Sequence, residues 1–484
     1  MIRNKAIIKI VGYLLLLETM LLLLCAAVSA WYGDSALRSL LLSAAITGAV
    51  GTFLGVSMRN EKLNSLSRRD GYLMVSLTWV AFAAFGMLPF LIDGHITNVA
   101  DAFFEAMSGL TCTGASILND IDNFPRGLLL WRSLSHWIGG LGIIMITIAV
   151  LPFFGVNSLQ MFAVEVSGPT VNKVNPRIGR TAQLIWMVYT GMTLLLIVLL
   201  ALGGMGIFDS VCHAMSVMAT GGFSTHQDSI AYYNSPYIEY VLTLFMFVSG
   251  INFNLLILLV MRRFSRVFHN GELRWYATMI GAVTLLFAAS LYLTRGMGAE
   301  ESLRKSLFQI VSLQTSTGLV SEDYGTWPMS LTVVLFGVMI VGGCAGSTSG
   351  GMKCIRLQVL VKVAKNEFKH ILHPNAVLPV RLDQTVSQPS LITTVMAFCF
   401  LYIAIIFVAA FLLSAMGINV IDAFGLSVSS IGNMGVAFGS YGPIYSWSSV
   451  PDAGKWLLSA LMLLGRVEIF TVLLLFTPHF WRRS

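Results

Sequence analysis

The feature that most constrains this chain is a series of long apolar runs, each about long enough to cross the hydrocarbon core of a membrane. A transmembrane helix needs about 20 mostly apolar residues, and about ten such runs are present, centred near residues 18, 47, 82, 142, 193, 248, 285, 340, 402 and 467. Hydrophobic residues occupy 56% of the 484 positions and charged residues only 11%, which leaves too little polar surface to enclose a soluble core. The sequence therefore predicts an all-α polytopic membrane protein and argues against soluble enzymes and nucleic-acid binders.

The charged residues predict how the chain lies in the membrane. There are 30 Lys and Arg residues against 23 Asp and Glu residues, a net charge of +7. If both termini are cytoplasmic, most basic residues fall in cytoplasmic segments and most acidic residues fall outside, as the positive-inside rule requires. We therefore expect cytoplasmic termini, a lipid bilayer as the surroundings and no nucleic-acid partner, because topology accounts for the positive charge.

Four short segments between the long apolar runs repeat one another. Each has a serine seven residues after its first residue and a glycine thirteen residues after it. The segments begin at Asp101, Asp209, Lys305 and Asp422 and end at Gly114, Gly222, Gly318 and Gly435. They are too short to cross a membrane, and their recurrence predicts a unit of helix, short re-entrant helix, extended loop and helix. We expect an N-terminal two-helix unit, residues 1–65, followed by four such units at 66–178, 179–270, 271–385 and 386–484.

The first residue of three of these segments is an aspartate, a residue type that favours helix N-caps. We expect Asp101, Asp209 and Asp422 to cap their short helices, and Glu301 or Ser302 to take that role in the third segment.

The loops after the short helices are candidates for a cation filter. Non-helical backbone at membrane depth is tolerated only where it is buried in protein or lines a water-filled cavity. Four such loops around one axis would form a ring whose carbonyl oxygens replace the hydration shell of a monovalent cation, with each glycine supplying a positive φ or a close approach. The alternative is that these small residues only pack helices together. The candidate filter residues are Thr111, Cys112, Thr113, Gly114, Ala219, Thr220, Gly221, Gly222, Thr315, Ser316, Thr317, Gly318, Gly432, Asn433, Met434 and Gly435. The expected cation ligands among them are Thr111, Cys112, Ala219, Thr220, Thr315, Ser316, Gly432 and Asn433.

The apolar run near residue 340 is interrupted by residues 342–351, where half of the positions are glycine. A segment this rich in glycine should not stay helical. The alternative is that Gly342, Gly346 and Gly350, spaced by four, pack one helix closely against another.

A single arginine, Arg466, lies near the middle of the last apolar run. A charge at this depth is costly and therefore indicates a function. Facing a pore, Arg466 would raise an electrostatic barrier to cations. The alternatives are a pair with Glu468 or with a backbone carbonyl of a neighbouring helix.

Catalytic and metal-binding signals are weak. The segment around Thr348 has threonine where a nucleophile elbow needs serine, no histidine is followed by glutamate, and no phosphate-binding loop is present. A membrane-embedded enzyme is the alternative of a different class, but we expect no enzyme and no covalent cofactor. The six cysteines lie in or beside apolar runs without paired spacing, so we also expect buried, reduced thiols rather than disulfides or a zinc site.

Four segments carry a resemblance to a known family: residues 109–116, 221–226, 322–328 and 465–470. They are similar to the bacterial TrkH/TrkG branch of the Trk/Ktr/HKT superfamily of cation transporters, and the similarity covers nearly the whole chain. The resemblance implies K⁺ uptake through one pore, built from four membrane–pore–membrane repeats of K⁺-channel type. Its selectivity glycines match Gly114, Gly222, Gly318 and Gly435. Some Na⁺-permeable relatives carry serine at the first of these positions, so Gly114 implies a preference for K⁺, with a Na⁺-permeable protein as the alternative.

The resemblance also implies a gate and partners. The gate is an intramembrane loop below the filter that acts together with Arg466, and its residues here are Gly346, Ser347, Thr348, Ser349 and Gly350. A homodimer in the bacterial inner membrane is implied, with a cytoplasmic TrkA-like protein that binds the regulatory nucleotide, ATP/ADP or NAD(H). Coupling of K⁺ to H⁺ or Na⁺ stays open. Glu18 and Glu468 are the candidate buried carboxylates for a coupled ion, and the position of Glu18 outside the four repeats favours a channel-like pore.

Overall fold

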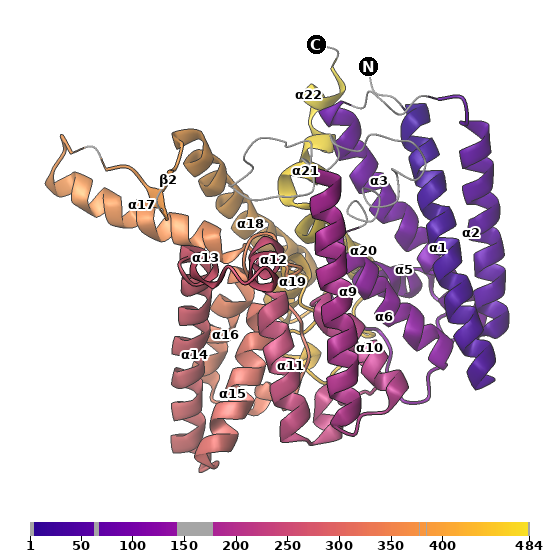
Figure 1. Ribbon diagram of the computed structural model, residues 1–484, viewed down its shortest axis with the longest axis horizontal. Coiled ribbons are helices and arrows are strands. Elements are labelled where there is room, and N and C mark those ends of the chain that lie inside the picture. Colours follow the sequence, from indigo (N-terminus) through magenta and orange to yellow (C-terminus); the bar gives the residue numbers. More distant parts are fainter. Residues whose placement is uncertain (1–3, 62–66, 143–177, 377, 384, 483–484) are drawn as a thin grey trace.

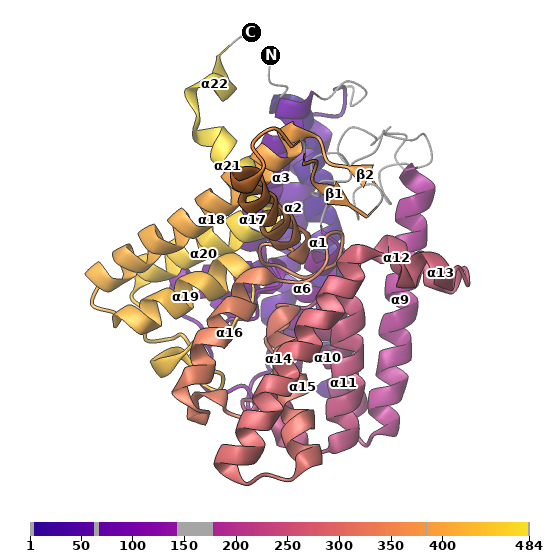
Figure 2. The ribbon, with the colours of Figure 1, turned by 90° about the vertical axis from the view of Figure 1, so that its left-hand side faces the viewer.

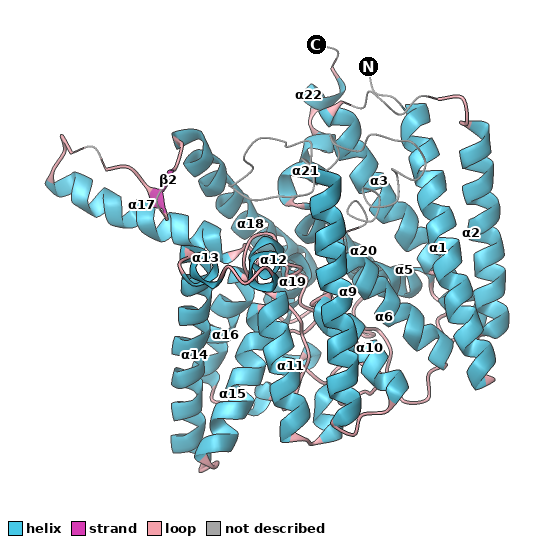
Figure 3. Cartoon of the chain, viewed as in Figure 1, coloured by secondary structure: helices cyan, strands magenta, loops and turns pink. Residues whose placement is uncertain are grey.

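The computed structural model describes residues 4–61, 67–142, 178–376, 378–383 and 385–482 of the chain. These ranges are almost entirely helical (Figure 3). Their only strands are β1 (Arg381–Leu382) and β2 (Thr385–Val386), which pair antiparallel. The start of α1 and the helix α22 (Pro478–Trp481) lie at the same end of the molecule (Figure 1). The predicted all-α polytopic membrane fold is confirmed.

Most of the predicted crossings are long helices. In the described part of the chain, six are long and apolar enough to span a membrane on their own: α1 (Asn4–Tyr32), α2 (Leu37–Ser57), α3 (Arg68–Gly86) continued by α4 (Leu88–Asp93), α9 (Ile178–Leu202), α14 (Gly271–Arg295) and α18 (Pro389–Ala415). Two further crossings in this part are sharply bent. The pair α11 (Pro236–Ser249) and α12 (Phe253–Val260) bends by 108°, and α20 (Asp452–Val467) followed by α21 (Ile469–Leu473) bends by 115°.

The two remaining predicted crossings are shorter helices. The helix α6 (Arg126–Leu141) accounts for the first half of the run near residue 142, and the run continues outside the described residues. The helix α16 (Met329–Val341) ends at Gly342, whose φ is +75°. The chain becomes helical again only at α17 (Cys354–Leu372), so the predicted interruption over 342–351 is confirmed.

Beyond this interruption, α17 extends sideways from the bundle (Figure 1), and the β1–β2 hairpin follows it. Figures 1 and 2 both place this hairpin in the half of the molecule that holds α22. The other short helical segments are α13 (Phe264–Phe268), η2 (Ser229–Tyr233), η3 (Tyr324–Thr326), η4 (Gly439–Tyr441) and η5 (Leu474–Phe476).

The four short segments form helices at the predicted places: α5 (Val99–Leu110), α10 (Ile207–Met218), α15 (Ala299–Gln314) and α19 (Val420–Gly432). Contacts between successive units run α6 to α10, α11 to α15 and α16 to α19. The helix α20, from the last unit, packs against α5, from the first. The four units therefore close into a ring around a common axis.

The predicted caps of the short helices were wrong. Asn98 caps α5 through the amide of Ala100, and Asn419 caps α19 in the same way. In α15 the cap position is Gly298 rather than Glu301 or Ser302. The aspartates expected as caps lie in the first turn, where a carboxylate still complements the helix dipole: Asp101, Asp209 and Asp422.

The N-terminal helices α1 and α2 approach each other closely at Gly12. A Cβ at Gly12 would lie 2.9 Å from the amide nitrogen of Gly55 and 3.0 Å from the carbonyl oxygen of Gly51. Small residues at such crossings allow helices to approach closely where lipid offers no hydrophobic driving force.

We expect Gly12→Ala to lower the thermal midpoint of the detergent-solubilised protein, because the added methyl group must push α1 and α2 apart. Overpacking of this kind costs about 1–3 kcal/mol. Size-exclusion chromatography after heating would follow the loss of folded protein. Gly281→Ala in α14 is the matched control, since a Cβ there meets nothing within 4 Å. Equal midpoints for the two variants would show that the contact at Gly12 does not stabilise the N-terminal unit.

Candidate cation pathway

The four short helices end in the same backbone motif. After α5, the amide of Thr113 donates to the carbonyl of Ser108, and the amide of Cys112 donates to that of Gly109. This pair of bonds defines a Schellman motif. The equivalent bonds after α10, α15 and α19 are Gly221 to Ser216, Thr220 to Val217, Thr317 to Ser312, Ser316 to Leu313, Met434 to Ser429 and Asn433 to Ser430. The serine shared by the four sequence segments is thus the residue whose carbonyl accepts the hydrogen bond that spans more residues.

Each loop contains two left-handed residues separated by one. The first has φ between +51° and +55° although it is not glycine, which is uncommon, and the second is the repeated glycine with φ between +74° and +86°. The first set is Cys112, Thr220, Ser316 and Asn433; the second is Gly114, Gly222, Gly318 and Gly435. These conformations prevent the loops from continuing as helices.

The repeated glycines join the loops into a closed ring. A Cβ at Gly114 would overlap the carbonyl oxygen of Gly221 in the next loop. The same overlap holds between Gly222 and Thr317, Gly318 and Met434, and Gly435 and Thr113. The last contact returns to the first loop, so the structure brings together the four loops that hold the predicted filter residues. Glycine is required there because no side chain fits beside the neighbouring carbonyl.

The ring is built from two alternating kinds of loop, which the sequence comparison of the segments did not reveal. In the first loop the hydroxyls of Thr111 and Thr113 are 2.8 Å apart, and in the third those of Thr315 and Thr317 are 2.7 Å apart. The second and fourth loops have no hydroxyl at these positions: Ala219, Gly221, Gly432 and Met434. Side-chain hydrogen bonds therefore stiffen opposite loops of the ring.

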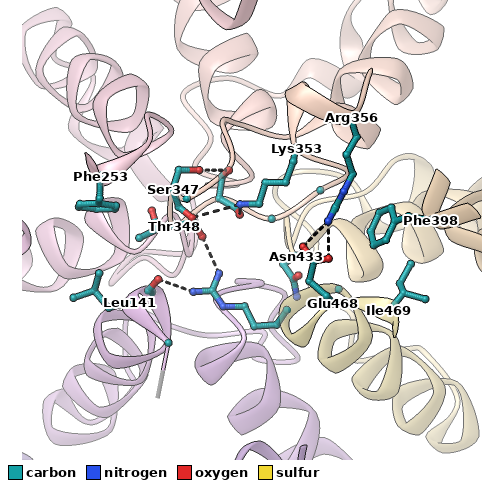
Figure 4. A pocket seen from close by; sticks show the side chains of 18 of the residues that line it. Leu141, Phe253, Ser347, Thr348, Lys353, Arg356, Phe398, Asn433, Glu468 and Ile469 are labelled. Atoms are coloured by element: carbon teal, nitrogen blue, oxygen red, sulfur yellow. Dashed lines mark hydrogen bonds and ion pairs between the residues drawn. The ribbon is translucent and has the colours of Figure 1, made fainter. Parts of the chain in front are cut away.

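Two cavities lie on the two sides of the ring. The glycine cavity, about 70 Å³, is lined by all four repeated glycines. The central cavity, about 170 Å³, is lined by residues 346–351, by Asn433 and by Arg466 (Figure 4). The ring therefore separates two spaces that a cation would pass in succession.

The loop of residues 342–353 lies directly against the ring. The amide of Gly350 donates to Ser316 Oγ at 2.5 Å, and Thr348 Oγ1 donates to the carbonyl of Met218 at 3.2 Å. A Cβ at Gly350 would overlap the carbonyl oxygen of Gly432. This loop, which we call the gate loop after its expected role, therefore lines the central cavity immediately beside three of the four short segments.

The guanidinium of Arg466 connects the gate loop to the end of α6. It donates to the carbonyl of Thr348 at 2.8 Å and to the carbonyl of Gly140, at the end of α6, at 2.7 Å. The expected alternative of a backbone carbonyl from a neighbouring helix is thus present. The other alternative, a pair between Arg466 and Glu468, is not the one that the structure shows, because Glu468 binds another arginine.

That arginine is Arg356, in the first turn of α17. Its Nη2 lies 2.6 Å from Glu468 Oε2 (Figure 4), and its Cζ lies 3.7 Å from the centre of the Phe398 ring. The sequence did not predict this pair, because α17 and the last crossing come together only in the tertiary structure.

A buried ion pair supports the first loop from behind. Arg132 Nε lies 2.8 Å from Glu105 Oε1, and both residues are at most 2% exposed. Arg132 Nη2 donates to Ser116 Oγ at 3.1 Å, and its Cζ lies 4.0 Å from the centre of the Phe223 ring. The pair therefore connects the segments that follow the first and second loops. Its sequence signal was a charge within the apolar helix α6.

A buried histidine makes a second connection between the same loops. His136 Nδ1 donates to the carbonyl of Gly109 at 2.6 Å, and the amide of Phe223 donates to His136 Nε2 at 3.2 Å. His136 is therefore a hydrogen-bonded structural residue. A Cβ at Gly221 would overlap the imidazole ring, so the second loop can lie this close only with glycine.

Known proteins share this architecture over its whole length. The TrkH family, described as cation transport protein, matches residues 39–483. The chain is 36% identical to the Trk system potassium uptake protein TrkH of Salmonella typhimurium and 31% identical to TrkG of Escherichia coli, in each case over 99% of both chains. The crystal structure of the potassium transporter TrkH from Vibrio parahaemolyticus superposes with a TM-score of 0.88 at 32% identity, covering 99% of this chain and all of that one.

The agreement extends from the sequence to the arrangement of the helices, and it confirms the resemblance on which the predicted fold depended. Because the matching family consists of transport proteins, the expectation that the chain is not an enzyme is also confirmed. The chain belongs to the TrkH family of cation transport proteins.

Proposed function

We propose that this protein takes up K⁺ across the bacterial inner membrane through the ring of four loops. The observation that carries the proposal is the closed set of contacts in which each repeated glycine faces a carbonyl of the next loop. These contacts hold the four loops together, so that the other main-chain carbonyl oxygens of the loops can replace the water around a dehydrated monovalent cation. The printed names of the relatives, potassium uptake proteins, support K⁺ as the cation.

The oxygen ligands would come from the main chain before each glycine, and the short-helix dipoles, negative at this end, would favour a cation there. The proposed filter comprises the sixteen residues predicted from the sequence. The proposed ligands are the carbonyls of Thr111, Cys112, Ala219, Thr220, Thr315, Ser316, Gly432 and Asn433.

The proposal includes the division of the chain and its orientation. Residues 66–178, 179–270, 271–385 and 386–484 form the four pore repeats, after a two-helix unit at 1–65. The position of α22 and the start of α1 at one end of the molecule supports termini on the same side (Figure 1), and the charge bias supports the cytoplasm as that side.

We propose that K⁺ moves down its electrochemical gradient, without a coupled ion. A coupling site would need a membrane carboxylate free to take up the ion. Glu468 is already paired with Arg356. Glu18 is fully buried in α1 and is not among the described residues that line either cavity.

In the arrangement described above, the gate loop closes the central cavity. It must leave the ring before K⁺ can pass, which breaks the bonds of Gly350 to Ser316 and of Thr348 to Arg466. We propose that a cytoplasmic nucleotide-binding protein of the TrkA kind, acting on a homodimer of this chain, moves the gate loop away from the ring.

Gly114→Ser tests the filter. A side chain at this position would overlap the Gly221 carbonyl and displace it from the ring. We expect the preference for K⁺ over Na⁺ to fall about tenfold, corresponding to about 1.4 kcal/mol. Flux of K⁺, Rb⁺ and Na⁺ into proteoliposomes of the purified protein would measure it.

Gly94→Ser is the matched control for this experiment. Gly94 has φ of +86°, close to the +81° of Gly114, but a Cβ there meets nothing within 4 Å. The control therefore carries the same backbone strain without the contact. If Gly114→Ser selects K⁺ as well as Gly94→Ser does, the ring is not the filter.

Gly350→Ala tests the gate loop. The added methyl group would overlap the Gly432 carbonyl, so the loop can no longer lie against the ring. We expect a severalfold higher K⁺ flux in the absence of any cytoplasmic partner. Gly337→Ala in α16, where a Cβ meets nothing within 4 Å, should leave the flux unchanged. A closed pore in both variants would contradict the assigned role of the loop.

Arg466→Gln tests the electrostatic barrier. A positive charge about 8 Å from a cation, at an effective dielectric constant of about 20, raises the energy of the cation by about 2 kcal/mol. This corresponds to about a 30-fold lower rate of passage. We expect flux through the partner-free protein to rise by up to this factor. Arg466→Lys keeps the charge but not both carbonyl bonds. Equal flux increases in the two variants would show that Arg466 acts as a tether and not as a barrier.

A further inference from the structure

Three side chains capable of binding a metal meet where the two ends of the gate loop lie against the start of α14. They are Glu272 in the first turn of α14, Cys344 at the start of the gate loop, and Cys354, the first residue of α17. Their ligand atoms all lie within 4.8 Å of one another. The two cysteines are fully buried and Glu272 is 8% exposed, so the cluster lies within the protein.

The backbone brings the two cysteines together. The amide of Cys354 donates to the carbonyl of Gly343 at 2.9 Å, which places the end of the gate loop beside its start. Glu272 Oε1 accepts the amide of Ala345 at 2.6 Å and lies 3.8 Å from Cys354 Sγ. A carboxylate has about four acceptor positions. The hydrogen bond from the Ala345 amide therefore orients the Glu272 carboxylate and leaves acceptor positions free for an ion.

The geometry and chemistry fit a soft divalent cation. Metal–sulfur distances of about 2.3 Å and metal–oxygen distances of about 2.0–2.2 Å in a tetrahedral site place two sulfurs about 3.8 Å apart and a sulfur about 3.5–3.7 Å from the carboxylate oxygen. The observed distance of 3.8 Å between Cys354 Sγ and Glu272 Oε1 is close to this value, so a small side-chain movement completes the geometry. Two thiolates select Zn²⁺ or Cd²⁺ over K⁺ and Mg²⁺. Two thiolates and one carboxylate carry three negative charges, which the ion and the adjacent Lys353 together would balance.

We propose that Glu272, Cys344 and Cys354 bind one Zn²⁺ or Cd²⁺ ion, and that the bound ion holds the gate loop in its closed position. The binding part depends only on the three side chains. The regulatory part rests on the proposed function, because it requires the gate loop to move when the pore opens. Binding joins both ends of the loop to α14 and so opposes that movement.

Cys344 and Cys354 are ten positions apart, and Glu272 is far from both in the sequence. Spacing therefore argued against a zinc site. The site exists only because the gate loop turns back on itself and lies against the start of α14.

The binding test uses the purified full-length protein in detergent under reducing conditions, titrated with Cd²⁺. The readouts are the ultraviolet charge-transfer band of cadmium thiolates and the metal content after gel filtration. We expect one ion per chain, loss of the band in Cys344→Ser and in Cys354→Ser, and at least about tenfold weaker binding in Glu272→Gln. Cys25→Ser and Cys399→Ser, which remove buried thiols elsewhere, should bind as the wild type does.

Absence of the band in the wild-type protein would overturn the proposal, as would a band that survives both Cys344→Ser and Cys354→Ser. Gel-filtration profiles identify any variant that fails to fold. For such a variant, Cys344→Ala and Cys354→Ala provide the same test.

The flux test separates binding from regulation. Cd²⁺ should inhibit Rb⁺ flux by the wild-type protein opened by its cytoplasmic partner, and EDTA should reverse the inhibition. Inhibition that persists unchanged in Cys344→Ser and in Cys354→Ser would show that Cd²⁺ acts at another site and would overturn the regulatory part. Cd²⁺ binding without any effect on flux would overturn the regulatory part and leave the binding part in place. Absence of Rb⁺ flux with intact Cd²⁺ binding would contradict the proposed function alone.

Discussion

The structure depends on the close approach of one backbone to another at the four repeated glycines. Non-helical chain at membrane depth must have its polar groups satisfied by protein or by a water-filled cavity. Here the Schellman bonds satisfy two amides in each loop, while carbonyls such as that of Gly221 face the neighbouring glycine. Any Cβ at these glycines would open the ring. The surrounding helices, including the contact of α20 with α5, hold the four loops at this separation.

The arginines around the ring have two kinds of partner. Arg132 and Arg356 each have a carboxylate partner, Glu105 and Glu468, and so add little net charge near the pathway. The bonds that the structure shows for Arg466 go instead to backbone carbonyls, one of them on the gate loop. A charge within a membrane-spanning segment is costly unless it has partners. The gate loop supplies a partner for Arg466 while Arg466 holds the loop, so one hydrogen bond joins the proposed electrostatic barrier to the proposed gate.

Much of this arrangement could be predicted from local sequence. Apolar runs of sufficient length predicted most of the crossings, the repeated serine and glycine predicted the short helices and their loops, and the glycine-rich stretch predicted the break after α16. The caps were predicted wrongly, because Asp101 was assigned by residue type although Asn98, three residues earlier, is the residue that accepts the amide of Ala100. The residue at which a helix begins depends on the path of the preceding loop, and tertiary contacts rather than local sequence determine that path.

The sequence by itself determined where the chain can be helical and where it cannot, because these follow from apolar length and from the backbone freedom of glycine. The tertiary structure alone decided the partners. It paired Arg356 with Glu468 and placed Arg466 against the gate loop. It also brought Cys344 and Cys354 to Glu272. Such contacts join residues far apart in the chain, and their geometry exists only after the four units have closed around one axis.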